Sequence, residues 1–495
     1  MIQHWLCMPL KDSWMSRRRH FSQSMSHTQL HTLIFVTFMC LFVRCCTSSA
    51  TPLDYKYSVF MDGGSTSTKL RVYKWQTPSS RDDIPHFTQI SVSRHTPGIS
   101  EYSDNLTAIA SYIRPMILES MKLVPKDLHK ITPIYFMATA GLRVLKGQMS
   151  LKIIRQLNMF LENSENNPFL FRRGQAQVLS GEEEAVFAWI AVNYLRGFFH
   201  KQENTSVGVL EMGGGSTQIV FVPKTPIYAN KFIAHIGSTY YHTYAHSYLN
   251  FGQAYLIERV QDHLLQQSGT NDSVLDPCRL RGDNTTVSDE NGRSVVMIGN
   301  GNAESCREIL EDFLNKQPPS DCSPKPCSIG TTYQSPLGDT IFYAVSAFVY
   351  PTNQINSTDA DERLNMDLMI KNTKTYCEMT IDEAVEVTGA NPKYASNNCI
   401  SGVFIPLLLK NAYGFPQNTT SIYMKKKINN KSPDWSLGAL IYQSEQKRDE
   451  CEVPSLTAPT TTITNSGSLK LSLTNGMTAI FAVFIFHLYF LCPLL

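Results

Sequence analysis

The chain has 495 residues, which is long for one compact domain and predicts two or three. Its composition, 42% hydrophobic and 17% charged residues, is that of an ordinary globular protein and excludes a disordered one. The net charge of +2 provides no positive field for a phosphate backbone, so we expect no nucleic acid partner.

The first 50 residues have the pattern of a targeting segment. Arg17 to Arg19 precede an uncharged apolar stretch of eleven residues, Leu33 to Val43, and small residues follow up to Ala50. This stretch is short for a membrane span and typical of a signal-peptide core. We predict that residues 1–50 are a signal peptide or an uncleaved signal anchor, and that the chain enters the secretory pathway.

Residues 51 to 222 alternate strand and helix patterns. "YSVFMDGG" and "TKLRVYKW" have the pattern of two strands around a glycine turn, and "PIYFMATAG" that of a buried strand. "SDNLTAIASYIRPMILESMKLV" and "GEEEAVFAWIAVNYLRGFF" have helical spacing. The second helix leads to another strand, glycine turn and strand, "GVLEMGGGSTQIVFVP". This alternation predicts an α/β architecture.

The two glycine turns repeat one arrangement. Each strand ends near a carboxylate, Asp62 or Glu211, and Gly, Ser and Thr follow. Successive backbone N–H groups without a Cβ form a concave nest that suits phosphate oxygens. A carboxylate there can hold a hydrated Mg²⁺ or Ca²⁺. Two facing turns therefore predict a polyphosphate held from both sides, by Gly63, Gly64, Ser65 and Thr66 in the first turn and by Gly214 and Gly215 in the second.

Other phosphate-binding motifs are excluded. The chain contains no G-x-x-x-x-G-K-[ST] sequence, so a P-loop does not explain the turns. A strand-like "IVFVP" follows the second turn where a dinucleotide-binding fold would have a helix.

Two motifs between the turns carry polar groups suited to catalysis. "ATAGLR" contains Arg143, which caps a helix or, near phosphate, neutralises charge that develops in a transition state. "SGEEEA" opens a helix with three acids. These acids complement the helix dipole, or one of them takes the proton of an attacking water.

The cysteines in the middle of the chain indicate that the protein folds in an oxidising compartment. Six cysteines lie between 278 and 399, and the simplest pairing is 278–306, 322–327 and 377–399. Cys451 is left over, either free or bridging two chains, so the protein is either a monomer or a covalent oligomer.

The surface motifs give two further expectations. The tripeptide "RGD" at 281–283 is typical of adhesion proteins, but a glycan on the neighbouring sequon would obstruct a receptor. Seven sequons suggest glycosylation: Asn105, Asn204, Asn271, Asn284, Asn356, Asn418 and Asn430.

The C-terminal part is predicted to tether the protein. A Ser/Thr/Pro-rich stretch is too polar to form a packed core, so we interpret it as a stalk. The chain then runs apolar from Met477 to its last residue, with no basic residue after it. Small residues at 465–468 and the apolar tail favour a glycolipid-anchor signal over a transmembrane anchor. Either kind of anchor would attach the protein to a membrane.

The order of MDGGSTST, ATAGLR, SGEEEAVFAW, EMGGGSTQ, SAFVY and DWSLG over residues 55 to 445 resembles the ecto-nucleoside triphosphate diphosphohydrolases, or ecto-apyrases. That family belongs to the actin and hexokinase superfamily, so the resemblance implies two ribonuclease-H-like α/β lobes with the site in the interlobe cleft and the disulfides in the second lobe. The implied domains are 1–50 targeting segment, 51–180 plus 428–447 lobe I, 181–427 lobe II, 448–475 stalk and 476–495 tail.

The resemblance also implies the reaction and the role of each site residue. Nucleoside tri- and diphosphates would be hydrolysed to monophosphates by in-line attack of water. Glu184 would be the general base, and Thr139, Ser216 and Gln218 would orient the water and the phosphoryl oxygens. Arg143 would support the first lobe's phosphate side, and Trp435 would be structural. Asp62 and Glu211 would hold Ca²⁺ or Mg²⁺ through water, and the base would contact Ala347, Phe348 and Tyr350.

Three positions depart from the family pattern. Glu211 stands where Asp is typical, which puts the metal geometry and the rate in doubt. Gly63 and Ala185 replace Ala and Gly. "GEEEA" with "GGGST" is also similar to bacterial exopolyphosphatases, whose substrate is inorganic polyphosphate. A catalytically weakened nucleotide-binding protein is the other alternative.

Overall fold

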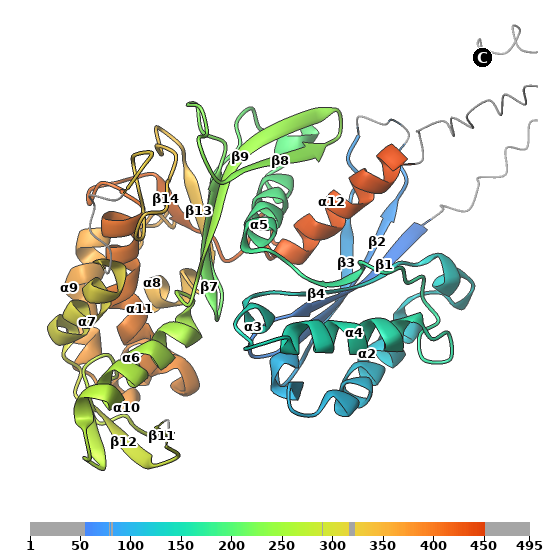
Figure 1. Ribbon diagram of the computed structural model, residues 1–495. Helices are drawn as coiled ribbons and strands as arrows, with labels where there is room; N and C mark the ends of the chain where they lie inside the picture. Colours follow the sequence, from blue (N-terminus) through green and yellow to red (C-terminus); the bar gives the residue numbers. More distant parts are fainter. Residues whose placement is uncertain (1–54, 79, 81–82, 290, 316–321, 451–495) are drawn as a thin grey trace, which may run out of the picture. The chain divides into compact units, whose positions relative to one another are not determined.

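The computed structural model describes residues 55–450, except 79, 81–82, 290 and 316–321 (Figure 1). The predicted targeting segment, the C-terminal tail, Cys451 and the stalk beyond residue 450 lie outside this range. Within it, no helix is both long enough and apolar enough to span a bilayer.

The first sheet is built around the first glycine turn. β1 (Tyr55–Gly63) and β2 (Thr68–Gln76) form the antiparallel hairpin, and β3 (Thr88–His95) extends it. β4 (Ile134–Ala138) and β5 (Ala176–Val178) add parallel strands on the other side of β1, giving the order β3-β2-β1-β4-β5.

The second sheet repeats this topology around the second glycine turn. β6 (Gly208–Met212) and β7 (Ser216–Phe221) form the hairpin and β9 (Thr239–Leu249) extends it, while β13 (Phe342–Ser346) and β14 (Ile422–Met424) run parallel to β6. The order is β14-β13-β6-β7-β9-β8, with β8 (Lys231–Ile236) as an added antiparallel edge. Two sheets of one topology confirm the predicted α/β class and explain why the sequence repeats itself.

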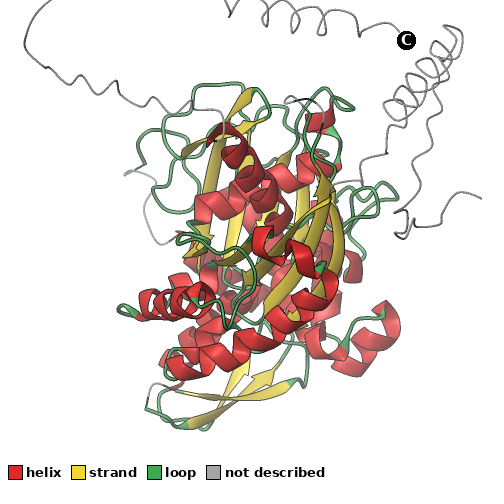
Figure 2. Ribbon diagram, turned by 90° about the vertical axis from the view of Figure 1, so that its right-hand side faces the viewer, coloured by secondary structure: helices red, strands yellow, loops and turns green. Residues whose placement is uncertain are grey.

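Helices cover the outer faces of the two sheets (Figures 1 and 2). α2 (Ile109–Leu123) and α4 (Met149–Glu162) bury one face of the first sheet. A small sheet of β10 (Ser273–Asp276), β12 (Ser294–Gly299) and β11 (Asn284–Ser288) lies beside the helices of the second half. Five helices share one core cluster with residues of the second sheet: α6 (Gln253–Ser268), α7 (Ala303–Asn315), α9 (Met366–Cys377), α10 (Ile381–Thr388) and α11 (Ala395–Leu407). α8 (Val349–Gln354) contacts β13 and α11.

One core cluster joins the two sheets through two helices. α5 (Gly181–Leu195) and α12 (Trp435–Glu450) share it with inner-face residues of both sheets. The helices touch at the backbone, because a Cβ at Gly438 would lie 1.8 Å from the carbonyl oxygen of Phe187. Trp435 is 7% exposed and packs edge-on to Phe60 of β1, as expected of a structural residue.

The cysteines pair as predicted, in the bonds Cys278–Cys306, Cys322–Cys327 and Cys377–Cys399. All seven sequon asparagines are exposed. Arg281 of "RGD" is engaged by Glu383, 3.1 Å away, and by the carbonyl oxygen of Glu378. This engagement further disfavours the adhesion function.

Candidate active site

The tips of the two glycine hairpins meet. A Cβ at Gly214 would lie 2.5 Å from Oγ of Ser65, so the second hairpin approaches the first closely enough to require glycine. The "ATAGLR" segment, which forms α3 (Ala140–Arg143) after β4, lies against both tips. A Cβ at Gly141 would meet Cα of Ser65 at 2.6 Å, and one at Gly215 would meet Cβ of Ala140 at 2.7 Å. The motifs are therefore neighbours in space.

Glu184 is placed by the start of α5. Ser180 caps this helix, and Glu183 completes a capping box with it, so the acid cluster does complement the helix start. Glu184, one residue further, points inward and is 5% exposed. Its Oε2 accepts a hydrogen bond from Arg143 and lies 3.3 Å from Nε2 of Gln218. Glu183 thus caps the helix, whereas Glu184 is a buried carboxylate.

Gln218 connects the second hairpin to its neighbouring strand. Its Nε2 lies 2.7 Å from Oγ of Ser216 and 3.0 Å from Oγ of Ser247, the residue directly opposite on β9. Arg143 also donates to Oγ of Ser216 at 3.2 Å. Among the described residues, Oε1 of Gln218 has no hydrogen-bond partner although it is buried. An unpaired buried acceptor is costly, so this oxygen is suited to accept a hydrogen bond from a bound water.

Asp62 lies at the end of β1 between two cations. Lys69 Nζ is 3.6 Å and Arg71 Nη1 is 3.5 Å from Oδ2 of Asp62. Arg71 also donates to Asp434, which immediately precedes α12. Asp62 and Arg71 are both almost fully buried.

Burial raises the pKa values of the carboxylates in this group. It raises the pKa of Glu184 to about 7, against the opposing charge of Arg143, and that of Glu211 to about 8, where the negative charge of Glu184 adds to the effect. The pKa of Asp62 is also raised by burial. Because burial disfavours the ionised form of these carboxylates, a positive charge close to them is needed to keep them ionised.

The carboxylates fit a hydrated divalent cation. Oε2 of Glu211 is buried and has no hydrogen-bond partner in the part of the chain that the structure describes. No group of three or more His, Cys, Asp or Glu that could cage a metal occurs among those residues. A few carboxylates with water as the remaining ligands is the pattern that Mg²⁺ uses, and Ca²⁺ also takes waters.

The predicted base-binding segment begins where β13 ends. The backbone N–H of Ala347 donates to the carbonyl oxygen of Met212 on β6, which ties the segment to the second hairpin. Phe348 is completely buried in the core of the second half, so its ring faces no ligand. Tyr350 is 56% exposed, and Lys426 Nζ lies 5.3 Å from its ring centroid. Of the predicted aromatic residues, Tyr350 alone presents an exposed ring.

The structure thus brings together the hairpin glycines with Thr139, Arg143 and Glu184. The N–H of Thr139 donates to the carbonyl oxygen of Gly63. Arg143, expected on the first lobe's phosphate side, contacts Glu184 and Ser216. Four further polar residues of this group were not predicted from the sequence: Lys69, Arg71, Ser247 and Asp434. Counting outward from the first turn reveals Lys69, because it pairs across the hairpin with Asp62, and Arg71 follows on the same face.

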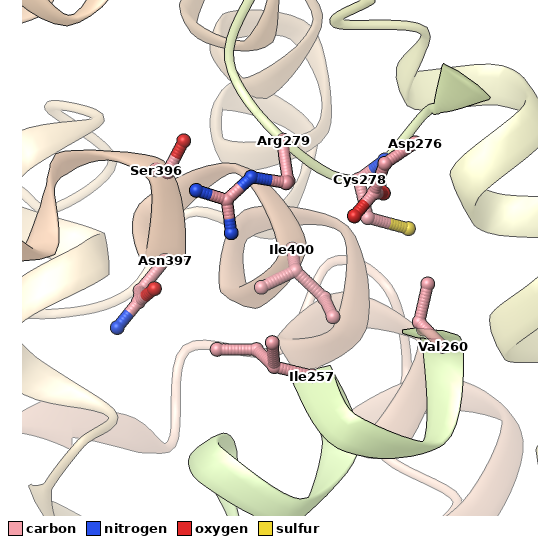
Figure 3. A pocket seen from close by; sticks show the side chains of 8 residues that line it. All are labelled: Ile257, Val260, Asp276, Cys278, Arg279, Ser396, Asn397 and Ile400. Carbon is pink, nitrogen blue, oxygen red and sulfur yellow. Dashed lines mark hydrogen bonds between the residues drawn. The ribbon is translucent and has the colours of Figure 1, made fainter. Parts of the chain in front are cut away.

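A small cavity elsewhere shares no residue with this group (Figure 3). Side chains of α6 and α11 line it, with Asp276 at the end of β10 and Arg279 in the segment that follows. Its volume of about 10 Å³ holds about one water molecule.

Comparisons with known proteins agree with this arrangement. The model of the GDA1/CD39 (nucleoside phosphatase) family matches residues 48–456. Ectonucleoside triphosphate diphosphohydrolase 1 of Bos taurus is 28% identical over 430 residues, 80% of this chain and 82% of the relative. Ectonucleoside triphosphate diphosphohydrolase 8 of Rattus norvegicus is 27% identical over 434 residues, 82% and 86% of the two chains. A crystal structure of nucleoside triphosphate hydrolases from Neospora caninum aligns with a TM-score of 0.63 and 14% identity, over 85% of this chain and 98% of that one.

Proposed function

Since the chain belongs to the GDA1/CD39 (nucleoside phosphatase) family, we propose that it is an apyrase that hydrolyses nucleoside tri- and diphosphates to monophosphates and phosphate. The observation that carries this proposal is the position of Glu184. Its buried carboxylate is linked through Gln218 and Arg143 to Ser216 in a glycine hairpin suited to phosphate.

The chain's own groups supply the chemistry of an in-line attack. Backbone N–H groups of Gly63 to Ser65 and of Gly214 to Ser216 would hold phosphate oxygens. Glu184 would accept the proton of a water whose oxygen bonds to the terminal phosphorus, while the bond from that phosphorus to the bridging oxygen breaks. Gln218 would orient the water through its unpaired Oε1, and Thr139 would face the same phosphoryl group. Arg143 would hold Glu184 in position.

Asp62 and Glu211 would hold Ca²⁺ or Mg²⁺ through water. Their burial and raised pKa values support this role, because a cation would keep both carboxylates ionised. When bound, the cation neutralises phosphate charge and aids departure of the leaving group.

Tyr350 would stack on the base. Its exposed ring supports the role, and stacking accepts any base, so we expect broad nucleotide specificity. Ala347 would contribute backbone contact, whereas Phe348 would support the segment from the core.

The catalytic part would face the lumen or the cell exterior, on a membrane tether formed by residues 1–50, 476–495 or both. The disulfides and the exposed sequon asparagines support this location.

Phosphate release by the full-length protein tests the function. We would supply ATP, ADP, UDP and inorganic polyphosphate in turn, each with Ca²⁺, with Mg²⁺ and with EDTA. We expect metal-dependent release from the nucleotides, and loss of at least about a thousandfold in kcat for Glu184→Gln with nucleotide binding retained. Glu182→Gln is the matched control on the same helical turn, because Glu182 pairs with His246 instead. Release from polyphosphate alone, or full activity of Glu184→Gln, would overturn the proposal.

A further inference from the structure

The first hairpin carries an ammonium group at the carboxylate proposed to hold the metal. Lys69 faces Asp62 directly across the β1–β2 hairpin, and their charged atoms are 3.6 Å apart. Asp62 is buried, with a side chain 4% exposed, so this pair is poorly screened by water.

Lys69 and Arg71 differ in how firmly they are held. Arg71 is bound to Asp434, and its side chain is 6% exposed, so it is fixed in a buried pair. The Lys69 side chain is 34% exposed and has a flexible stem with three donors, which leaves its ammonium free to move. Lys69 is therefore the cation of this hairpin that can exchange partners.

The other two cations of the site have carboxylates of their own. Arg143 pairs with Glu184, and Arg71 pairs with Asp434. Arg71 also lies 3.5 Å from Asp62, but its bond to Asp434 holds it in place. Lys69 is therefore the mobile cation next to Asp62, the first of the two proposed metal carboxylates. The charge of Lys69 acts to lower the pKa of both.

We infer that Lys69 couples metal binding to nucleotide binding: its ammonium competes with the divalent cation for Asp62 and transfers to a phosphate oxygen when a nucleotide binds. This inference rests on the proposed function, because it takes Asp62 as a metal carboxylate and the hairpin as a phosphate site. Lys69 makes metal and nucleotide binding mutually supportive, since phosphate removes the competitor from Asp62. By thermodynamic linkage, the cation must strengthen nucleotide binding by the same factor.

Calorimetric titration of the nucleotide-free, full-length protein with Ca²⁺ tests the competition. We expect Lys69→Met to bind Ca²⁺ at least about tenfold more tightly than the unmodified protein, and Lys69→Arg, which keeps the charge, to stay within about threefold of it. Lys74→Met is the matched control, because Lys74 lies on the same strand but over the ring of Tyr55, 4.9 Å from its centroid. Equal or weaker Ca²⁺ binding by Lys69→Met, or no Ca²⁺ binding by either protein, overturns the inference.

A second titration, with an imido-bridged ATP analogue in EDTA, tests the transfer to phosphate. We expect Lys69→Met to bind the analogue about tenfold more weakly, with Lys69→Arg and Lys74→Met unchanged. Unchanged binding by Lys69→Met overturns the transfer. Neither titration needs turnover, so a protein that hydrolyses no nucleotide defeats the proposed function while Ca²⁺ affinity still decides the role of Lys69.

Discussion

Glu211 is 7% exposed, and one of its oxygens has no partner among the described residues. Burial, with the charge of Glu184, raises its pKa from 4.5 to about 8. Between these values the folded protein binds more protons than the unfolded chain, so this carboxylate lowers stability progressively as the pH rises.

Glu211→Gln should therefore stabilise the metal-free protein. In EDTA near pH 8 we expect its free energy of unfolding to exceed that of the unmodified protein by about 1–3 kcal/mol, because an amide carries no charge to desolvate. The difference should shrink towards zero near pH 5. Urea denaturation at both values measures it, and a gain that does not depend on pH would contradict the assignment.

The pH dependence of turnover provides a residue-scale test of Glu184. Burial raises its pKa to about 7, and a general base acts only when it is ionised. We expect kcat/KM for ATP to fall about tenfold for each pH unit below about 7. In Arg143→Met, kcat/KM should begin to fall at a higher pH, because the positive charge of Arg143 opposes the effect of burial on the pKa of Glu184. A profile that is flat from about pH 5.5 to 8 would exclude Glu184 as the base.

At the scale of the element, the start of α5 sets the position of two other site residues. A Cβ at Gly181 would lie 2.2 Å from Cβ of Ser247 and 2.7 Å from Nη1 of Arg143. Alanine favours a helix over glycine by about 1 kcal/mol, but here it displaces the partners of Gln218 and Glu184.

We expect Gly181→Ala to lower kcat at least about tenfold while KM changes little, because orientation at the reacting atoms is lost. Steady-state kinetics with ATP measures both constants. Gly213→Ala is the control: a Cβ there meets neighbours only at 3.7 Å and beyond, so most of the activity should remain. Equal effects of the two substitutions would refute the positional argument.

At the scale of the whole molecule, α12 and α5 join the cores of both sheets. Because a Cβ at Gly438 would lie 1.8 Å from the carbonyl oxygen of Phe187, Gly438→Ala must separate the helices. We expect a loss of about 2–3 kcal/mol in the free energy of unfolding. Ser444→Ala is the control on the same helix, since its hydroxyl bonds within the helix. A Gly438→Ala protein of unchanged stability would contradict this packing.

The features that the sequence revealed are contiguous ones. A glycine turn, its flanking strands and the capped start of α5 depend on neighbouring residues, so composition and spacing are enough to predict them. Each of the six cysteines forms its disulfide with the next cysteine along the chain, so their order in the sequence is enough to predict the pairs. The contacts that were missed, Gln218 with Ser247 and Arg71 with Asp434, join residues brought together only by strand order and helix packing. The burial of Phe348 was missed for the same reason.

The Arg71–Asp434 pair joins residues 363 positions apart, one in the second strand and the other just before the last described helix. A ribosome that has completed the first hairpin must add nearly all the remaining globular chain before Arg71 meets its partner. Until then, the hairpin has two cations, Lys69 and Arg71, facing the single carboxylate of Asp62. Synthesis therefore completes the surroundings of the proposed phosphate site late, and a chain that ends prematurely before Asp434 lacks the second partner of Arg71.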